Sequence, residues 1–174
     1  MLYCRGTRTL PSLPAVARPI GVRPTDSFND GPTLEAYRYS ISMRTDFAGD
    51  LPIIRADRVQ LQQVLLNLML NGIEAMKEAP GELTIKSEAR QDGQLLIWVM
   101  DAGVGLPPGK ADQIFNAFFT TKPQGSGMGL AISRSIVESH GGHLWATPNS
   151  GRGTTFRFTL PTRVEEAKVS LSKT

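Results

Sequence analysis

The chain has 174 residues and a mass of 18.9 kDa, of which 40% are hydrophobic and 20% charged, a composition that suits one domain with a sizeable core. The net charge is +3 and the basic residues are scattered, so the charge pattern gives no indication of nucleic acid as a partner. A single cysteine, Cys4, excludes an internal disulfide framework and a multi-cysteine metal site, and no apolar run reaches the roughly 20 residues of a membrane span. A cytoplasmic protein without a membrane span in this chain is therefore the expectation.

The first 37 residues differ from the rest of the chain. They are punctuated by Pro11, Pro14, Pro19, Pro24 and Pro32, and they show little periodicity. This pattern predicts an irregular or disordered segment over 1–37, with room for a short helix over 33–39. The early prolines also interrupt the apolar region that a signal peptide would need.

From residue 38 onward, strand and helix signals follow each other. The sequence predicts strands over 39–47, 51–56, 82–89, 94–100, 143–147 and 154–160. It predicts a long helix over 57–78 and a second from about 127 to 140, separated by a loop-rich span, and a polar tail over 163–174. About five strands against about three helices, the short one included, indicate an α+β fold: a two-layer sandwich with a mixed, mostly antiparallel sheet.

The long helix carries an asparagine stripe. Asp57 is suited to cap its start, and apolar residues cover most of its circumference, so burial on nearly all sides is expected. Asn67 and Asn71 are four residues apart and share the remaining narrow polar arc, so their amides lie one above the other. Such groups need partners, which could be other side chains, water or a ligand.

Two glycine motifs are candidates for ligand contact. Asp101 ends an apolar strand and is followed by Gly103 and Gly105, which would let the backbone approach a flat ligand. The carboxylate of Asp101 could then accept a hydrogen bond from an exocyclic amine of that ligand. On its own this pattern is also that of an ordinary turn. The run 125–130, GSGMGL, opens a helix whose free amides could bind an anion, although a flexible hinge would look the same.

Two further stretches complete the set. The run 114–122, IFNAFFTTK, puts three phenylalanines into polar surroundings, where they could form a satellite core or anchor a loop that closes over a ligand. Lys122 could reach a phosphate or remain solvated. In the run 151–156, GRGTTF, the hydroxyl of Thr154 could enter a pocket, or the threonine could be present for its strand propensity alone.

Taken in order, the asparagine helix, DAGVG, FFTTK, GSGMGL and GRGTTF resemble the N, first glycine, F, second glycine and last glycine boxes of bacterial sensor histidine kinases of the nitrogen- and oxygen-sensing type. The resemblance covers residues 38–162 and implies their catalytic ATP-binding domain, the Bergerat fold of the GHKL ATPases. It implies ATP and Mg²⁺ as cofactors, with phosphoryl transfer governed by positioning and charge neutralisation.

The resemblance also implies roles for individual residues. Asn71 would bind Mg²⁺, and Asn67, placed where gyrase-type relatives have a glutamate base, would position groups and would not take a proton. Asp101 would read adenine with support from Thr154, while Gly103 and Gly105 let the base lie against the backbone. The phosphates would be held by residues of the F and second glycine boxes: Thr121, Lys122, Gly125, Gly127, Met128, Gly129 and Leu130. Asn67, Asn71 and Lys122 are the implied catalytic residues.

Two features depart from the family. Gly72 stands where alanine is usual, and residues 1–37 contain no histidine, so a histidine-bearing dimerisation unit is not expected within this sequence. The two histidines, His140 and His143, both follow the second glycine box, and His140 is expected to be a structural residue whose charged form the helix dipole favours. The chain is then an isolated catalytic domain, a fragment or a remnant, expected to be monomeric and to need a histidine-bearing dimerisation domain and a response regulator as partners. A non-catalytic nucleotide-binding or interaction module and a stand-alone GHKL-type ATPase are the alternatives.

Overall fold

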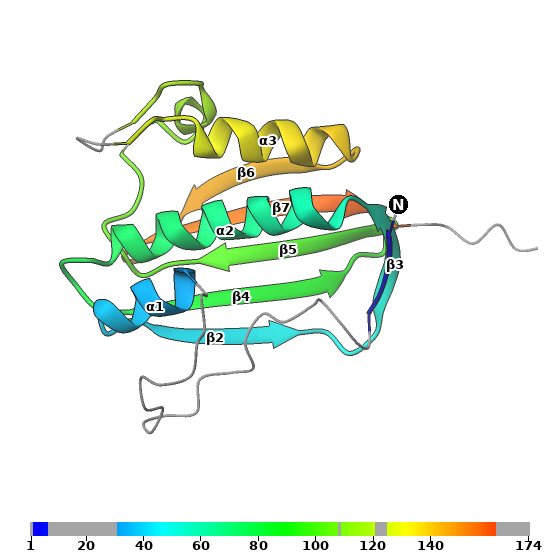
Figure 1. Ribbon diagram of the computed structural model, residues 1–174, viewed down its shortest axis with the longest axis horizontal. Helices are drawn as coiled ribbons and strands as arrows, with labels where there is room; N and C mark the ends of the chain where they lie inside the picture. The colour runs from blue at the N-terminus through cyan, green and yellow to red at the C-terminus, as the bar shows by residue number, and fades with distance from the viewer. Residues whose placement is uncertain (1, 7–30, 108, 121–124, 163–174) are drawn as a thin grey trace, which may run out of the picture.

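The computed structural model describes residues 2–6, 31–107, 109–120 and 125–162. Figure 1 shows the elements along the chain, which are β1 (Leu2–Gly6), α1 (Gly31–Arg38), β2 (Ser42–Phe47), β3 (Leu51–Ala56), α2 (Arg58–Ala75), β4 (Glu82–Ala89), β5 (Gln94–Met100), the 3-10 turn η1 (Gln113–Phe115), α3 (Gly129–Ser139), β6 (His143–Pro148) and β7 (Thr154–Pro161). Within these described residues no helix is both long and apolar enough to cross a bilayer.

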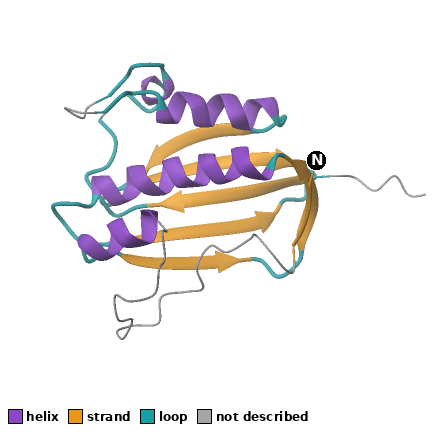
Figure 2. Ribbon diagram, viewed as in Figure 1, coloured by secondary structure: helices purple, strands orange, loops and turns teal. Residues whose placement is uncertain are grey.

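A five-stranded sheet forms one layer and the helices form the other. The strand order is β2-β4-β5-β7-β6, with β2 parallel to β4 and every other neighbouring pair antiparallel. All three α-helices lie on the same face of this sheet (Figure 2). The two-layer α+β sandwich with a mixed, mostly antiparallel sheet is thus confirmed, and a separate two-stranded sheet of β1 and β3 stands beside it.

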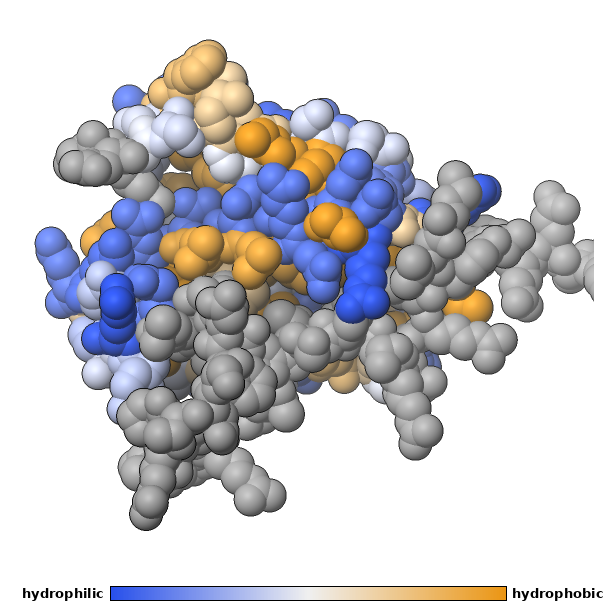
Figure 3. Space-filling view, in the orientation of Figure 1, coloured by the Kyte–Doolittle hydropathy of each residue, from blue (hydrophilic) through white to orange (hydrophobic). Residues whose placement is uncertain are grey.

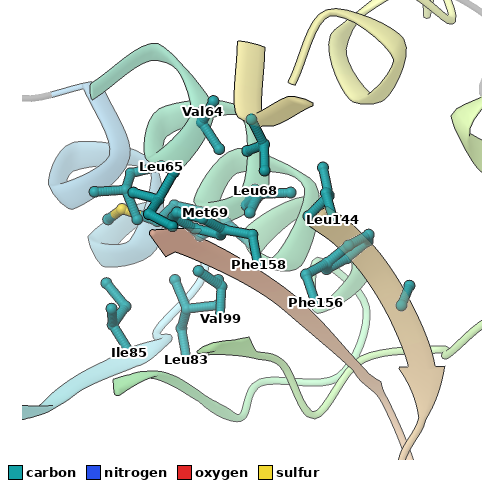
Figure 4. Close-up of a cluster of buried hydrophobic side chains, with 14 of the residues drawn as sticks. Val64, Leu65, Leu68, Met69, Leu83, Ile85, Val99, Leu144, Phe156 and Phe158 are labelled. Atoms are coloured by element: carbon teal, nitrogen blue, oxygen red, sulfur yellow. The ribbon is translucent and has the colours of Figure 1, made fainter. Parts of the chain in front are cut away.

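The core lies between α2 and the sheet (Figure 4). Leu68 and Met69 of α2 face Leu83, Val99 and other buried strand residues, and these four residues are at most 2% exposed. Asp57 begins the helix as predicted, because its carboxylate accepts hydrogen bonds from the N–H groups of the next turn at 2.8 and 3.1 Å. The long helix is therefore fixed at its start and along one side.

The expectation that α2 is buried on nearly all sides is wrong. Val59 is 71% exposed, and Leu66 and Leu70 are 43% and 39% exposed. Figure 3 shows apolar patches among polar side chains in the region of this helix. The physical reason is the two-layer architecture, in which the sheet covers α2 from one side and its two helical neighbours only flank it. Sequence apolarity alone does not distinguish a flanked helix from an enclosed one.

The expectation of an irregular segment over 1–37 also differs from the structure at two places. β1 pairs antiparallel with β3, and α1 begins at Gly31, a little earlier than the short helix that the sequence allows. Strand pairing supplied by a distant partner gives no local periodic signal, which is why β1 is not apparent from sequence. Residues 7–30 and the tail 163–174 lie outside the described residues.

His140 connects the two long helices at the end of the molecule opposite the connection between β5 and α3. Its Nδ1 lies 2.8 Å from the carbonyl oxygen of Ile136, and its Nε2 accepts the backbone N–H of Asp57 at 3.0 Å. His140 is therefore a structural residue, as expected, because both of its ring nitrogens are engaged where the end of α3 meets the start of α2.

We expect His140→Ala to lower the free energy of unfolding by about 0.5–1.5 kcal/mol, the net value of a typical hydrogen bond. The loss arises because the N–H of Asp57 is left to water and α3 is no longer tied to the start of α2. Urea denaturation measures this change. His143→Ala is the matched control, since His143 is an exposed residue that stacks on Trp145 and has no such backbone bond. Equal losses in both variants would contradict a linking role for His140.

Candidate functional site

A cavity of about 720 Å³ opens between the C-terminal half of α2, the beginning of α3 and the ends of the central strands. Figure 1 shows these two helix ends on the same side of the molecule, where the chain passes from β5 to α3. Its walls include many of the residues singled out in the sequence: Asn67, Asn71, Gly105, Gly125, Gly127, Gly129, Leu130 and Thr154. Segments more than 80 residues apart in sequence thus come together around one space.

Asp101 lies beneath this cavity, where β5 ends beside the start of β7. The register pairs Met100 with Thr155, and the backbone N–H of Asp101 donates to the carbonyl of Thr154 at 2.9 Å. One carboxylate oxygen, Oδ1, accepts the N–H of Gly103 at 2.9 Å and that of Thr154 at 3.1 Å. The side chain is only 4% exposed, and this network fixes its orientation.

The carboxyl of Asp101 is electrostatically unusual. Burial raises its pKa above the ordinary value, and the N–H groups of Gly103 and Thr154 act in the opposite direction. A buried, oriented carboxyl beside an apolar cavity is a typical binding-site group, because it can pair with one complementary donor and rejects ligands that lack one. Asn149 supports it from behind, donating to the Asp101 carbonyl oxygen at 2.8 Å.

Two glycines allow the backbone to close around this carboxyl. Gly153 has φ +95°, and a Cβ there would lie 2.0 Å from the carbonyl oxygen of Asp101. Gly105 has φ +79° and lies against Gly153. The last and first glycine motifs therefore meet in space, and the glycines are needed because the two backbones touch.

We expect Gly153→Ala to lower the free energy of unfolding by at least about 2 kcal/mol, since alanine would be strained at this φ and would overlap the backbone. Urea denaturation measures the loss. The control is Gly151→Ala, two residues earlier, where a Cβ would have nothing within 4 Å. If the two variants had the same free energy of unfolding, the close contact between Gly153 and the backbone of Asp101 would contribute nothing to stability.

Asn67 and Asn71 line the cavity from α2, one turn apart. The side-chain nitrogen of Asn67, Nδ2, donates to the carbonyl of Gly129 at 3.3 Å and to the hydroxyl of Ser133 at 3.2 Å. Its amide therefore ties α2 to the first turn of α3. Glu74, a further turn along, and Lys77 also line the cavity and lie 3.7 Å apart as an ion pair.

The beginning of α3 is shaped by backbone contacts. Gly127 has φ +67°, and its carbonyl accepts the N–H of Phe118 at 3.1 Å, which draws the two ends of the connection together. Phe118 itself has φ +66° and is 77% exposed, an uncommon conformation for a large side chain. Met128 precedes the helix as its N-cap, so the first amides of α3 lie beside the cavity-lining Gly129.

The three phenylalanines of the run 114–122 have three different environments. Phe115 is buried and meets Phe156 edge-to-face, with ring centroids 6.5 Å apart, while the guanidinium of Arg134 lies 4.1 Å from its ring centroid. Phe119 lines the cavity and Phe118 is exposed. Phe115 therefore belongs to the core, while the closing of a loop over a ligand stays a prediction. Thr121 and Lys122 lie outside the described residues.

Sequence reasoning singled out no role for Ser133 or Asn149, although both contact the site network. Only the folded structure reveals these contacts, since neither residue belongs to a glycine or asparagine motif. Asp101, Gly103 and Met128 adjoin the cavity without being among its lining residues. Among the described residues, no group of three or more histidine, cysteine, aspartate or glutamate side chains could hold a metal ion.

Comparison with known proteins places this geometry in a family. Residues 56–164, more than half of the chain, match the family described as histidine kinase-, DNA gyrase B-, and HSP90-like ATPase. The chain belongs to this ATPase family. Within the family its relatives include sensor histidine kinases, and this domain is their catalytic ATPase part.

Among the relatives of this ATPase domain is the sensor protein FixL of Bradyrhizobium diazoefficiens, which is 42% identical over 127 residues. The aligned region covers 72% of this chain and 25% of FixL. The sensor protein TdiS of Thauera aromatica is 41% identical, with 74% of this chain and 24% of TdiS covered. The chain thus spans about a quarter of the length of these curated relatives.

Solved histidine kinase structures share the fold of the ATPase domain. The catalytic domain of ThkA in a nucleotide-free form matches with a TM-score of 0.67 and 35% identity, covering 75% of this chain and 84% of that one. Full-length ShkA in complex with AMPPNP matches with a TM-score of 0.68 and 30% identity, over 75% of this chain and 27% of ShkA. ThkA has also been solved with the response regulator TrrA, at a TM-score of 0.64, 32% identity and coverage of 75% and 37%.

Proposed function

We propose that the chain is a Mg-ATP-binding catalytic domain that donates the γ-phosphate to a histidine on a separate dimerisation domain. The observation that carries the proposal is Asp101, a buried carboxyl oriented by Gly103 and Thr154 beneath a cavity whose opposite walls hold two asparagines and the start of a helix. The domain extends over 38–162, functions in the cytoplasm, where ATP is available, and is monomeric.

Adenine recognition follows from the Asp101 network. Oδ1 is engaged by two backbone N–H groups, so the second oxygen, Oδ2, is the one left to accept a hydrogen bond from an exocyclic amine. A base with a carbonyl oxygen at that position would place two acceptors together and would be rejected. The approach of Gly105 to Gly153 gives the flat base a smooth backbone surface to lie against. The expected preference is for ATP over GTP.

The phosphates belong at the other end of the cavity. The first amides of α3 and the glycines at 125, 127 and 129 lie together at this end, and the start of a helix is suited to bind anions. Thr121 and Lys122 would contact the phosphates from the preceding stretch. Asn71 is suited to hold Mg²⁺, because a neutral amide oxygen is a hard ligand and this ion otherwise keeps waters and phosphate oxygens. When bound, Mg²⁺ supplies charge neutralisation between the phosphate groups.

The phosphoacceptor must come from elsewhere. Both nitrogens of His140 are engaged, and this residue caps the far end of the 11-residue helix α3, roughly 16 Å from its first turn at 1.5 Å per residue. His143 begins the next strand. Since a nucleophile must come within about 3–3.5 Å of the reacting phosphorus, neither ring serves as acceptor. A histidine-bearing helix pair, and then a response regulator of the kind bound by ThkA, are the proposed partners.

A phosphotransfer assay tests this function. The purified chain, radiolabelled ATP and Mg²⁺ are mixed with a separately produced histidine-bearing dimerisation domain of a similar kinase. We expect acid-labile, base-stable label on that domain and none on the chain alone. Label on the chain itself that disappears in a His140 or His143 variant would refute the division of roles.

The same assay separates the alternatives. Steady ATP hydrolysis without label on the acceptor would indicate a stand-alone ATPase. Nucleotide binding with neither reaction would indicate a non-catalytic module. The geometry argues against the ATPase, because the amide of Asn67 donates its N–H groups to α3 and has no proton-accepting base to offer water.

A further inference from the structure

The amide of Asn67 is held by α3 at two points. Nδ2 carries two N–H groups, and the structure gives it two acceptors: the carbonyl oxygen of Gly129 at 3.3 Å and the hydroxyl oxygen Oγ of Ser133 at 3.2 Å. Gly129 and Ser133 are one helical turn apart, so they present their oxygens on the same face of α3. The nitrogen edge of the Asn67 amide is therefore committed to that face.

Ser133 acts toward Asn67 as an acceptor. Its hydroxyl proton is directed to the carbonyl of Gly129 at 2.9 Å, which leaves lone pairs facing Asn67. The Gly129 carbonyl likewise has no proton to give. If the amide of Asn67 turned over, its oxygen Oδ1 would face the carbonyl oxygen of Gly129, and Ser133 could donate to Oδ1 only by giving up its own bond to Gly129, which is unfavourable in this part-buried position. The network thus selects one of the two amide orientations.

Ser133 is completely buried, at 0% exposure, within α3. Alanine would favour the helix more, and a buried hydroxyl needs a hydrogen bond to offset its desolvation. The bond to Gly129 satisfies the hydroxyl, but it does not explain why a hydroxyl stands at this position. The contact with Asn67 does, because it supplies the second acceptor that completes the amide's partners.

We infer that Ser133 is a positioning residue for the Mg-nucleotide: Ser133 fixes the Asn67 amide so that the amide oxygen Oδ1 faces the cavity. This inference rests on the proposed function. Asn67 lines the cavity beside Asn71, so a fixed Oδ1 adds a second neutral oxygen on the wall where Mg²⁺ and its waters are expected. Without Ser133 the amide would be free to populate the wrong orientation, and the site would be less well preorganised.

Calorimetric titration tests the inference with Mg·AMPPNP and with Mg-free ADP as probes. We expect Ser133→Ala to weaken the binding of Mg·AMPPNP by about 5- to 10-fold, the size of one lost neutral hydrogen bond, and the binding of Mg-free ADP by less than about twofold. Ser135→Ala is the matched control, because it is the same change at an exposed position of the same helix. It should leave both affinities within about twofold of the wild type.

A double-mutant cycle separates positioning from general stability. In the Asn67→Ala background, Ser133→Ala should change the affinity for Mg·AMPPNP by less than about twofold, because the amide it orients is gone. A further 5- to 10-fold loss in that background would contradict the inference. Should Ser133→Ala prove too unstable to titrate, Ser133→Cys keeps the size with a weaker acceptor, and an undiminished affinity in that variant would also contradict it.

The wild-type titration distinguishes a failure of the proposed function from a failure of the role of Ser133. A wild-type chain that fails to bind Mg·AMPPNP contradicts the proposed function and this inference with it. A wild type that binds, together with Ser133→Ala that binds equally well, contradicts only the role of Ser133. Thermal melting of the nucleotide-free variants checks that any loss of affinity is not a loss of fold.

Discussion

We expect Asp101→Asn to weaken ATP binding by about 1–3 kcal/mol, the penalty for leaving a buried polar group without its partner. The substitution is isosteric, so the contacts of Oδ1 with Gly103 and Thr154 can persist. An amide N–H₂ group can then occupy the place of Oδ2 and face the exocyclic amine of adenine, donor against donor. Calorimetry with ATP measures the loss.

The same variant should not lose stability when nucleotide is absent. Because burial raises the pKa of Asp101 in the folded state, the unfolded chain gives up this proton at lower pH than the folded chain does. As pH rises from below the ordinary value of 3.8 and through the folded pKa, this carboxyl therefore subtracts from stability, and the penalty stays at neutral pH. Asparagine carries no such charge, so the melting temperature at pH 7 should equal or exceed that of the wild type.

Asp50→Asn is the control, since Asp50 is an exposed carboxyl in the turn between β2 and β3. It should leave both ATP affinity and melting temperature unchanged. An Asp101→Asn variant with unaltered ATP affinity would end the assignment of Asp101 as the adenine reader. A variant that loses affinity and melts much earlier would instead identify Asp101 as a structural residue.

We expect Asn71→Ala to remove the Mg²⁺ dependence of ATP binding and to reduce phosphotransfer by at least about 100-fold, comparable with deleting one well-placed electrostatic contact in an active site. The physical reason is that the cavity wall loses the amide oxygen proposed to hold the ion. Titration of ATP with and without Mg²⁺ measures the first effect, and transfer to the acceptor domain measures the second.

Gln63→Ala provides the control for this experiment. Gln63 lies two turns earlier on the same polar arc of α2, but it is exposed and is not among the residues that line the cavity. We expect it to behave as the wild type. An Asn71→Ala variant that kept its Mg²⁺ dependence would place the ion on another ligand, with Asn67 as the next residue to replace.

Much of the fold could be predicted because its signals are local. The strands over 51–56, 82–89 and 94–100 have the same bounds in the structure as in the sequence prediction, since alternating side chains and turn residues mark both ends. The Asp57 cap likewise marks the start of the long helix, which begins at the next residue.

The contacts across the site could not be read in the same way. Ser133 and Asn149 serve Asn67 and Asp101 only because the folded chain brings them together, and a single sequence carries no record of that proximity. The hydrogen bond between His140 and the N–H of Asp57 likewise joins residues that are 83 positions apart. Which residues of α2 are exposed depends on how the layers are arranged, since Leu66 is exposed and Leu68 is buried although both are leucines.

A crystal structure of the chain with Mg²⁺ and AMPPNP would test the central claim most directly. It should show the exocyclic amine of adenine within about 3 Å of the Asp101 carboxylate, as an N–H···O hydrogen bond requires. The phosphates should lie at the start of α3, with the ion contacting the side-chain oxygen of Asn71. A nucleotide bound elsewhere, or in this cavity with its base turned away from Asp101, would contradict the account.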